Sequence, residues 1–235
     1  MAKVLLYVPF IAALFVGCGG GSDPAPVPLV EITPAPVAVI SGSVATGAAL
    51  AGAIVTVTER AGNNACTTAP ISTDANGAYR CVLTDSAVPP FLVLALDPSG
   101  LVKPMVSLQT DRPALGSTAT VNVTPLTTAM VAQLAPHKDP YSFVSDSTLL
   151  AAVTSSTMNA LKANVAAQLS TVLSEVGVNQ ATFDPVSTVF AAGSNTGVDK
   201  MLDQVRVSFE NGNPVLTNLL NPNAAPVPLA DATGA

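Results

Sequence analysis

The chain has little of the side-chain chemistry on which most enzymes depend. Its 235 residues include one histidine and no tryptophan, and only 10% of them are charged. The histidine, His137, lies in a proline-flanked polar loop beside Lys138 and Asp139, which is typical of a solvated histidine and not of a catalytic base. No Gly-x-Ser-x-Gly motif is present, so a hydrolase of that type has no support. We therefore expect no catalytic residues and no enzymatic activity.

Basic residues and metal-binding patterns are also scarce. Nine Lys and Arg stand against 15 Asp and Glu, which gives a net charge of −6. Such a chain should be repelled by nucleic acid, so we exclude that class of partner. There is no Cys-x-x-Cys motif to accompany the lone histidine, and we expect no metal and no cofactor.

Two segments have a partial likeness to ligand-binding loops. In Gly193 to Lys200, the residues Val198 and Asp199 stand where a phosphate loop needs Lys and Ser or Thr, so we interpret the segment as a turn that opens a helix. Asp74-x-Asn76-Gly77 lacks the later ligands of a calcium loop and predicts a tight turn. An enzyme that uses carboxylates alone, with Asp184, Asp199 and Asp203 brought together, remains a minor alternative.

The first 18 residues have the layout of an export signal. Lys3 precedes an apolar run from Val4 to Val16, which is too short to span a bilayer, and a small residue and a cysteine follow. Leu14-Phe15-Val16-Gly17-Cys18 resembles the lipobox of bacterial lipoproteins, although the pattern prefers Leu, Val or Ile at the position of Phe15. This resemblance implies that residues 1–17 are removed and that Cys18 is acylated. A cleaved secreted form and a retained anchor are the alternatives.

The resemblance also implies a location. Gly19 follows Cys18, whereas an Asp at this position usually retains Gram-negative lipoproteins in the inner membrane. We therefore expect an outer-membrane lipoprotein of a Gram-negative bacterium that faces the periplasm or the cell surface. Loss of Lys3 with the leader leaves eight basic and 15 acidic residues, a net charge of −7.

Export determines how the two remaining cysteines are interpreted. If Cys18 carries lipid, Cys66 and Cys81 are left as a pair in an oxidising compartment, where a disulfide is expected. The loop that they close would contribute about 3 kcal/mol in the chain-entropy model. Two free buried thiols are the alternative.

Composition divides the remaining chain into segments. Residues 18–37 are rich in Gly and Pro and predict an extended tether or an unstructured tail. From residue 38 to residue 123, short β-branched and apolar runs alternate with turn signals, which predicts an antiparallel β-sandwich of about seven strands. The runs that carry this prediction are 39–44, 53–58, 71–73, 78–83, 91–96, 102–108 and 119–123. Asp74 to Gly77 predicts a hairpin between the third and the fourth.

Three motifs in this segment carry a family resemblance. They are Gly42-x-Val44, then Ala49-Leu50-Ala51-Gly52-Ala53-x-Val55-x-Val57, and Thr73-Asp74-Ala75-Asn76-Gly77-Ala78-Tyr79. Together they resemble the carboxypeptidase regulatory-like domain, which is related to the collagen-adhesin B-type repeats. The resemblance implies a transthyretin-like sandwich. No lysine lies between Lys3 and Lys103, so the lysine–asparagine crosslink of adhesin-type members is not expected.

Residues 124–220 predict a small, mainly helical domain that ends in a β-hairpin, so that the whole chain has an α+β fold. Thr124 is the predicted N-cap of a helix, with Pro125 at its first helical position. Apolar residues recur every three or four positions from Ser156 to Val176 and predict one long helix. Asn211-Gly212 predicts the terminal hairpin turn. This region resembles the helical part of uncharacterised exported bacterial proteins, and residues 221–235 predict a disordered tail.

These expectations favour a non-enzymatic lipoprotein of the cell envelope. It would be anchored to the membrane through Cys18 and act as a binding, spacer or structural module, with an envelope protein or polysaccharide as a possible partner. The alternative is an accessory module that binds a glycan or a protein beside a separate enzyme. An exposed aromatic patch or an apolar groove would favour this alternative.

Overall fold

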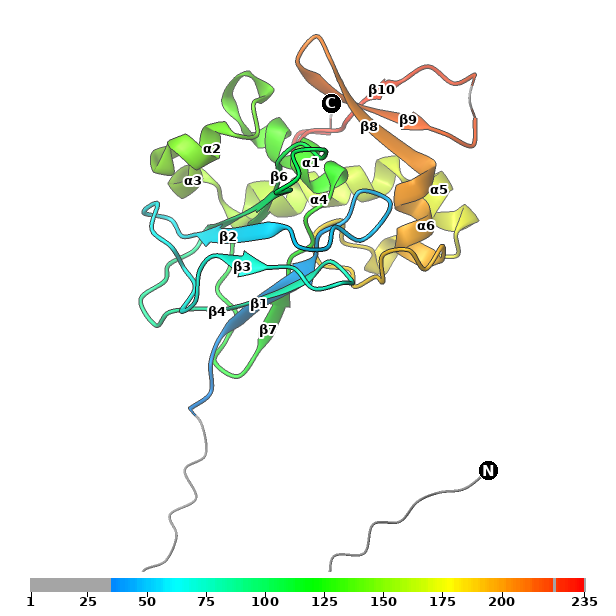
Figure 1. Cartoon of the computed structure of the whole chain (residues 1–235). Coiled ribbons are helices and arrows are strands. Elements are labelled where there is room, and N and C mark those ends of the chain that lie inside the picture. Colours follow the sequence, from blue (N-terminus) through cyan, green and yellow to red (C-terminus); the bar gives the residue numbers. More distant parts are fainter. Residues whose placement is uncertain (1–34, 222, 235) are drawn as a thin grey trace, which may run out of the picture. The chain divides into compact units, whose positions relative to one another are not determined.

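The computed structural model describes residues 35–221 and 223–234, and the residues from Pro36 onward form one compact unit (Figure 1). Its fold is mixed α+β. Within the described residues there are ten strands in three sheets and six α-helices. No helix among them is long and apolar enough to cross a membrane.

The first seven strands form two sheets. Strands β4 (Ala78–Val82), β1 (Val39–Ser43) and β7 (Thr118–Thr120) make the smaller sheet in that order. The larger sheet has the order β3 (Ile71–Ser72), β2 (Ile54–Thr58), β5 (Phe91–Leu96) and β6 (Met105–Gln109). The strand segments expected at 39–44, 53–58, 78–83 and 91–96 are thus confirmed.

Two details of the predicted sheet are wrong. The pairing is not antiparallel throughout, because β1 and β7 run parallel. The tight turn at Asp74–Gly77 is present, with Asp74 Oδ1 accepting hydrogen bonds from the backbone N–H groups of Asn76 and Ala78. It does not close a hairpin, since β3 pairs with β2 and β4 pairs with β1. The turn therefore carries the chain from one sheet to the other, a long-range choice that local turn residues do not encode.

A glycine sets the approach of β1 to the segment after β7. A Cβ atom on Gly42 would lie 2.0 Å from the carbonyl oxygen of Val121. Nearby, the buried phenol of Tyr79 on β4 donates a hydrogen bond of 2.6 Å to the same oxygen. Backbone and side chain thus meet too closely at position 42 for any other residue.

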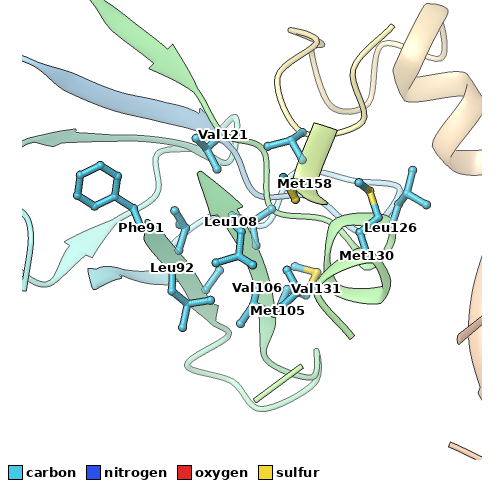
Figure 2. Packing of buried hydrophobic residues seen from close by; sticks show 14 of the residues in the cluster. Phe91, Leu92, Met105, Val106, Leu108, Val121, Leu126, Met130, Val131 and Met158 are labelled. Carbon is cyan, nitrogen blue, oxygen red and sulfur yellow. The ribbon is translucent and has the colours of Figure 1, made fainter. Parts of the chain in front are cut away.

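Helix α1 (Pro125–Leu134) begins with a complete capping box. The Thr124 side chain accepts from Thr127 N, and the Thr127 hydroxyl accepts from Thr124 N, so the predicted N-cap is confirmed. The helix packs against β6, and Figure 2 shows side chains of β5 and β6 lying close to Leu126, Met130 and Val131 of α1 and to Met158 of α4. Sheet and helices therefore share one hydrophobic core.

The helical region contains more breaks than the sequence predicts. It contains a 3₁₀ turn (Pro136–Lys138) and the helices α2 (Ser142–Ser145), α3 (Ser147–Ala152), α4 (Ser155–Gln168), α5 (Ser170–Glu175) and α6 (Gly197–Gln204). A second 3₁₀ turn spans Gln180–Thr182. The single helix expected over 156–176 is wrong, because Leu169 leaves the helical conformation between α4 and α5 while its side chain stays buried.

The chain ends in a third sheet. Strands β8 (Val205–Glu210) and β9 (Asn213–Asn218) form the predicted antiparallel hairpin, whose turn residues Asn211 and Gly212 both have positive φ. Strand β10 (Val227–Pro228) then pairs with β9, and Leu229 is buried at 1% exposure. Residues 223–234 thus differ from the disordered tail that the sequence predicts, because one buried leucine and one strand pairing fix them to the hairpin.

Candidate functional site

Two of the three cysteines form the predicted disulfide. Cys66 and Cys81 form a disulfide, and both residues are buried. Cys81 belongs to β4, while Cys66 lies in the connection between β2 and β3, so the bond ties this connection to β4. Cys18, the predicted lipidation site, lies outside the described residues.

The loop from Gly193 to Lys200, which partly resembles a phosphate loop in sequence, binds a carboxylate of its own chain. Asp199, in the first turn of α6, is buried at 1% exposure. Its oxygens accept hydrogen bonds from the backbone N–H groups of Gly193 at 3.0 Å and Asn195 at 2.7 Å. An internal anion therefore takes the amides that a phosphate would need, and the interpretation as a helix-opening turn is confirmed.

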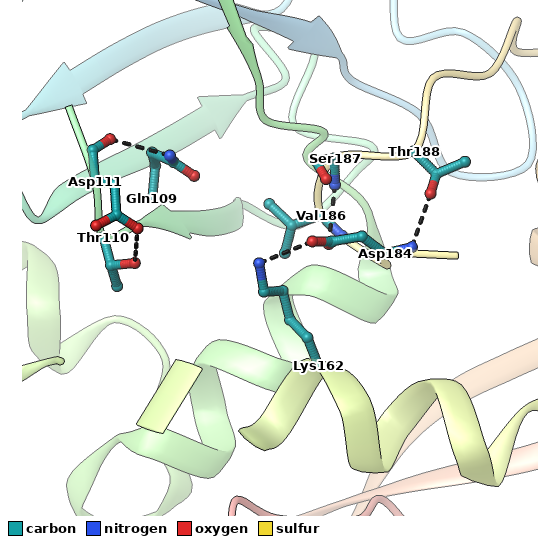
Figure 3. A network of polar contacts seen from close by, with 8 residues as sticks. All are labelled: Gln109, Thr110, Asp111, Lys162, Asp184, Val186, Ser187 and Thr188. Carbon is teal, nitrogen blue, oxygen red and sulfur yellow. Dashed lines mark hydrogen bonds and ion pairs between the residues drawn. The ribbon is translucent and has the colours of Figure 1, made fainter. Parts of the chain in front are cut away.

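The other two candidate carboxylates, Asp184 and Asp203, lie in different segments of the chain. Asp184 pairs with Lys162 of α4 at 2.8 Å and accepts from the N–H groups of Val186 and Ser187 (Figure 3). Burial alone would raise the pKa of Asp184, but the hydrogen bond and charge of Lys162, together with the two amides, outweigh it and lower that pKa. Asp203 lies on α6 with Asp199, and partial burial, followed by the Asp199 charge, raises the pKa of Asp203.

His137 is exposed in the 3₁₀ turn after α1, as its polar surroundings predict. Its neighbour Lys138 donates a 2.6 Å hydrogen bond to Gln133 Oε1. Within the part of the chain that the structure describes, no three His, Cys, Asp or Glu side chains are placed to hold a metal ion.

A concave surface lies along β8. Two adjoining hollows of about 410 Å³ and about 260 Å³ share Thr46, Pro125 and Val207 as lining residues, and we call them together the β8 groove. The larger half is lined by apolar groups of Val102, Pro104 and Met105 opposite β8. Its volume falls in the range of small-ligand and peptide-side-chain pockets.

Two aromatic side chains border the larger half of the groove. Tyr141 precedes α2 and is 36% exposed, while Phe209 belongs to β8 and is 45% exposed. The Tyr141 hydroxyl donates a 2.7 Å hydrogen bond to the Pro104 carbonyl, which fixes the ring against the opposite wall. Burial, followed by the nearby Asp139 charge, raises the pKa of Tyr141, so this hydroxyl stays protonated at neutral pH.

The charges of the groove are unevenly distributed. Lys103 is the one charged residue among those that line the larger half, and Asp203 and Arg206 line the smaller half. Lys103 is thus the one cation that lines the larger half, while the charge of Asp139 lies near Tyr141 at its border. This combination of apolar wall, aromatic rings and one cation suits binding.

Tyr141 and Phe209 belong to no sequence motif that marks them as site residues. The two are distant in sequence, and only the fold brings both to the larger half of the groove. One available signal was the alternation of Val205, Val207 and Phe209, which marks one side of a strand in a chain with few aromatic residues.

Comparisons of the chain with protein-family models, with curated proteins and with solved structures find no match.

Proposed function

We propose that the protein is an exported lipoprotein, anchored through Cys18 in the outer membrane of a Gram-negative bacterium, where it acts as a non-enzymatic module of the cell envelope. The observation that carries this proposal is the leader of residues 1–17, with its apolar run and a cysteine after a small residue. The disulfide between Cys66 and Cys81 supports it, because such bonds persist in oxidising compartments outside the cytosol.

The non-enzymatic role is supported by what the ionisable side chains do in the fold. Asp199 caps the loop before α6, Asp184 pairs with Lys162, and Asp74 closes a turn. Of the three candidates for acid–base chemistry, Asp184 and Asp199 are thus engaged in local structural contacts, while Asp203 lines the smaller half of the β8 groove. We propose that the residues after Pro36 supply a folded body and that any activity is one of binding.

The proposal includes a fold family. We propose that residues 38–123 form a transthyretin-like sandwich of the carboxypeptidase regulatory-like type, followed by a helical region at 124–220. This is supported by two sheets of three and four strands whose inner residues belong to the same core. The disulfide between Cys66 and Cys81 would take the stabilising place of the lysine–asparagine crosslink.

Replacement of the anchor cysteine tests the proposed location. In cells that express the full chain, Cys18→Ser should move the protein from the membrane pellet to the soluble periplasmic fraction, because the lipid that holds it is no longer attached. A matched Gly19→Asp variant should remain lipidated but shift to the inner membrane in a density gradient. A Cys18→Ser chain that still sediments with the envelope, or a native chain that begins at Met1, would contradict the anchor.

The β8 groove favours a second candidate function, an accessory module that binds a glycan or a protein beside a separate enzyme. Tyr141 and Phe209 are partly exposed along a groove with apolar walls. Such surfaces on soluble proteins commonly mark interaction sites. Loss of binding to purified envelope components in a Phe209→Ala variant, but not in a Val189→Ala variant, would assign that binding to the groove, since Val189 is exposed outside it.

A further inference from the structure

The outer edge of β8 leaves backbone N–H and C=O groups exposed. In the hairpin, Gln204 O accepts a hydrogen bond from Leu219 N, so the pair Gln204–Leu219 is a hydrogen-bonded pair of the ladder. Hydrogen-bonded and non-hydrogen-bonded pairs alternate in antiparallel strands. The backbone groups of Arg206 and Ser208 therefore face β9, and those of Val207 and Phe209 face away from it.

Within the part of the chain that the structure describes, these outward groups have no hydrogen-bond partner. Among residues 35–221 and 223–234, no backbone or side-chain hydrogen bond is made by the N–H or C=O groups of Val207 or Phe209 away from β9. Each such group normally finds a partner when a strand is covered. The edge is thus a row of donors and acceptors at the spacing of an extended chain.

The open edge faces the larger half of the groove. Val207, Ser208 and Phe209 all line it, although consecutive side chains point to opposite faces of a strand, and no residue of β9 lines it. A surface that touches three consecutive residues of β8 and none of β9 lies along the edge of the hairpin. Its opposite wall is apolar, with Val102, Pro104 and Met105.

We propose that the β8 groove binds an extended segment of a partner protein, which adds a strand to the outer edge of β8. This inference deepens the second candidate function and rests on it for the role of the groove in binding. The backbone of the segment would pair with the N–H and C=O groups of Val207 and Phe209, and alternate apolar side chains would enter the hollow bordered by Tyr141. A glycan has no backbone that alternates donor and acceptor at this spacing.

Charge further defines the occupant. Lys103 is exposed and is the one charged residue among those lining the larger half, so an acidic side chain in the segment would be favoured there. A second copy of this chain fits less well, because two molecules that each carry a net charge of −7 without the leader repel each other. The segment is therefore an apolar and acidic peptide of a different protein.

The test uses the chain from residue 18 with Cys18→Ser, and a display library of random heptapeptides as the probe. Enriched peptides should alternate apolar and polar residues and include an acid. Each is resynthesised in two forms, N-methylated on one or on the other alternate set of amides. One form should bind at least tenfold more weakly than the other, because only one set of amides faces β8 in the added strand.

Two variants of one residue distinguish strand addition from ordinary apolar contact. Val207→Pro removes the outward N–H without touching the bonds to β9, and should weaken binding at least tenfold. Val207→Thr keeps the N–H and the branched shape, and should bind within about twofold of the parent chain. Lys103→Gln should weaken binding several-fold at low salt and less at high salt.

The following outcomes would overturn the proposal: no peptide enriched on the chain, equal binding of the two N-methylated forms, or equal binding to a Val207→Pro variant that unfolds at the parent temperature. If the chain self-associates and Val207→Pro abolishes this association, the occupant of the groove is a second copy of the chain and the proposed partner protein is wrong. Binding is measured on a chain without lipid, so a failure here leaves the fractionation test of the anchor unaffected.

Discussion

Among the described residues, strands β6 and β8 each have one edge without a neighbouring strand, and the two edges differ in what covers them. At β6 the backbone N–H of Val106 donates to the Thr128 hydroxyl at 3.0 Å, and the Thr127 hydroxyl donates to the Val106 carbonyl at 3.0 Å. Helix α1 thus covers this edge with side chains. At β8 the corresponding groups of Val207 and Phe209 meet only the groove.

At β6 the side chains of a packed helix satisfy the outward backbone groups of an edge strand. Thr127 and Thr128 stand in the first turn of α1, where Thr127 also completes the capping box with Thr124. A short run of threonines therefore satisfies both a helix end and a strand edge. An edge left open beside an apolar hollow is better explained by binding than by an inability to cover it.

The largest difference between the two edges is expected when the same substitution, valine to proline, is made at each of them. Val106→Pro removes a buried N–H that is bonded to Thr128 and places the proline ring against α1, so the free energy of unfolding should fall by about 3 kcal/mol or more. Val207→Pro removes an unbonded N–H at an open edge and should cost less than about 1 kcal/mol. Urea unfolding of the soluble Cys18→Ser chain measures both. Similar losses would show that the β8 edge is also structural.

A smaller change at the covered edge tests the hydrogen bond between the Val106 N–H and the Thr128 hydroxyl. Thr128→Val keeps the volume of the side chain but leaves the Val106 N–H buried without an acceptor, which should cost about 1–3 kcal/mol. Thr128→Ser restores the hydroxyl and should recover most of that loss. If the valine and serine variants unfold at the same denaturant concentration, the hydroxyl does not close the edge.

The smallest effect concerns acid. Asp184 has a pKa lowered below its unfolded value because Lys162 and two backbone amides outweigh the effect of burial. Its contribution to stability is therefore complete above the unfolded pKa of about 4 and is lost as the pH falls through the folded pKa. Asp184→Asn should cost about 1 kcal/mol at pH 7 and flatten the loss of stability below pH 4.

Hydrogen exchange locates that acid effect. Asp184 follows the 180–182 turn, and Lys162 lies on α4, so acid should increase exchange in these segments. The amides of the β8–β9 hairpin should keep their protection over the same pH range. Equal loosening of both regions would contradict the assignment of the acid effect to the Lys162–Asp184 pair.

The sequence predicted those parts of the fold whose determinants are local. Thr124 and Pro125 mark the start of α1, and Asn211-Gly212 marks the hairpin turn, because caps and positive-φ turns depend on neighbouring residues. The α+β class and the disulfide also follow from patterns in the chain, namely the switch in apolar period and the pair of cysteines.

The features that the sequence missed depend on partners distant in the chain. The parallel pairing of β1 with β7, the crossing at Asp74–Gly77 and the burial of Leu229 are each decided by which surface the segment meets. The same reason explains the candidate site. Tyr141 and Phe209 have no shared motif, and only the packing of the hairpin brings both to one groove.

Several hydrogen bonds to the backbone, at the β6 edge and elsewhere in the fold, come from neutral side chains. Hydroxyls of Thr127 and Thr128, the phenol of Tyr79 and the amide of Asn122, which donates to the Thr188 carbonyl, bind backbone groups without any net charge. Attractions between neutral dipoles of this kind are hardly weakened by dissolved ions. These contacts should therefore change little with salt concentration, which suits a protein whose proposed location shares the ionic composition of the medium outside the cell.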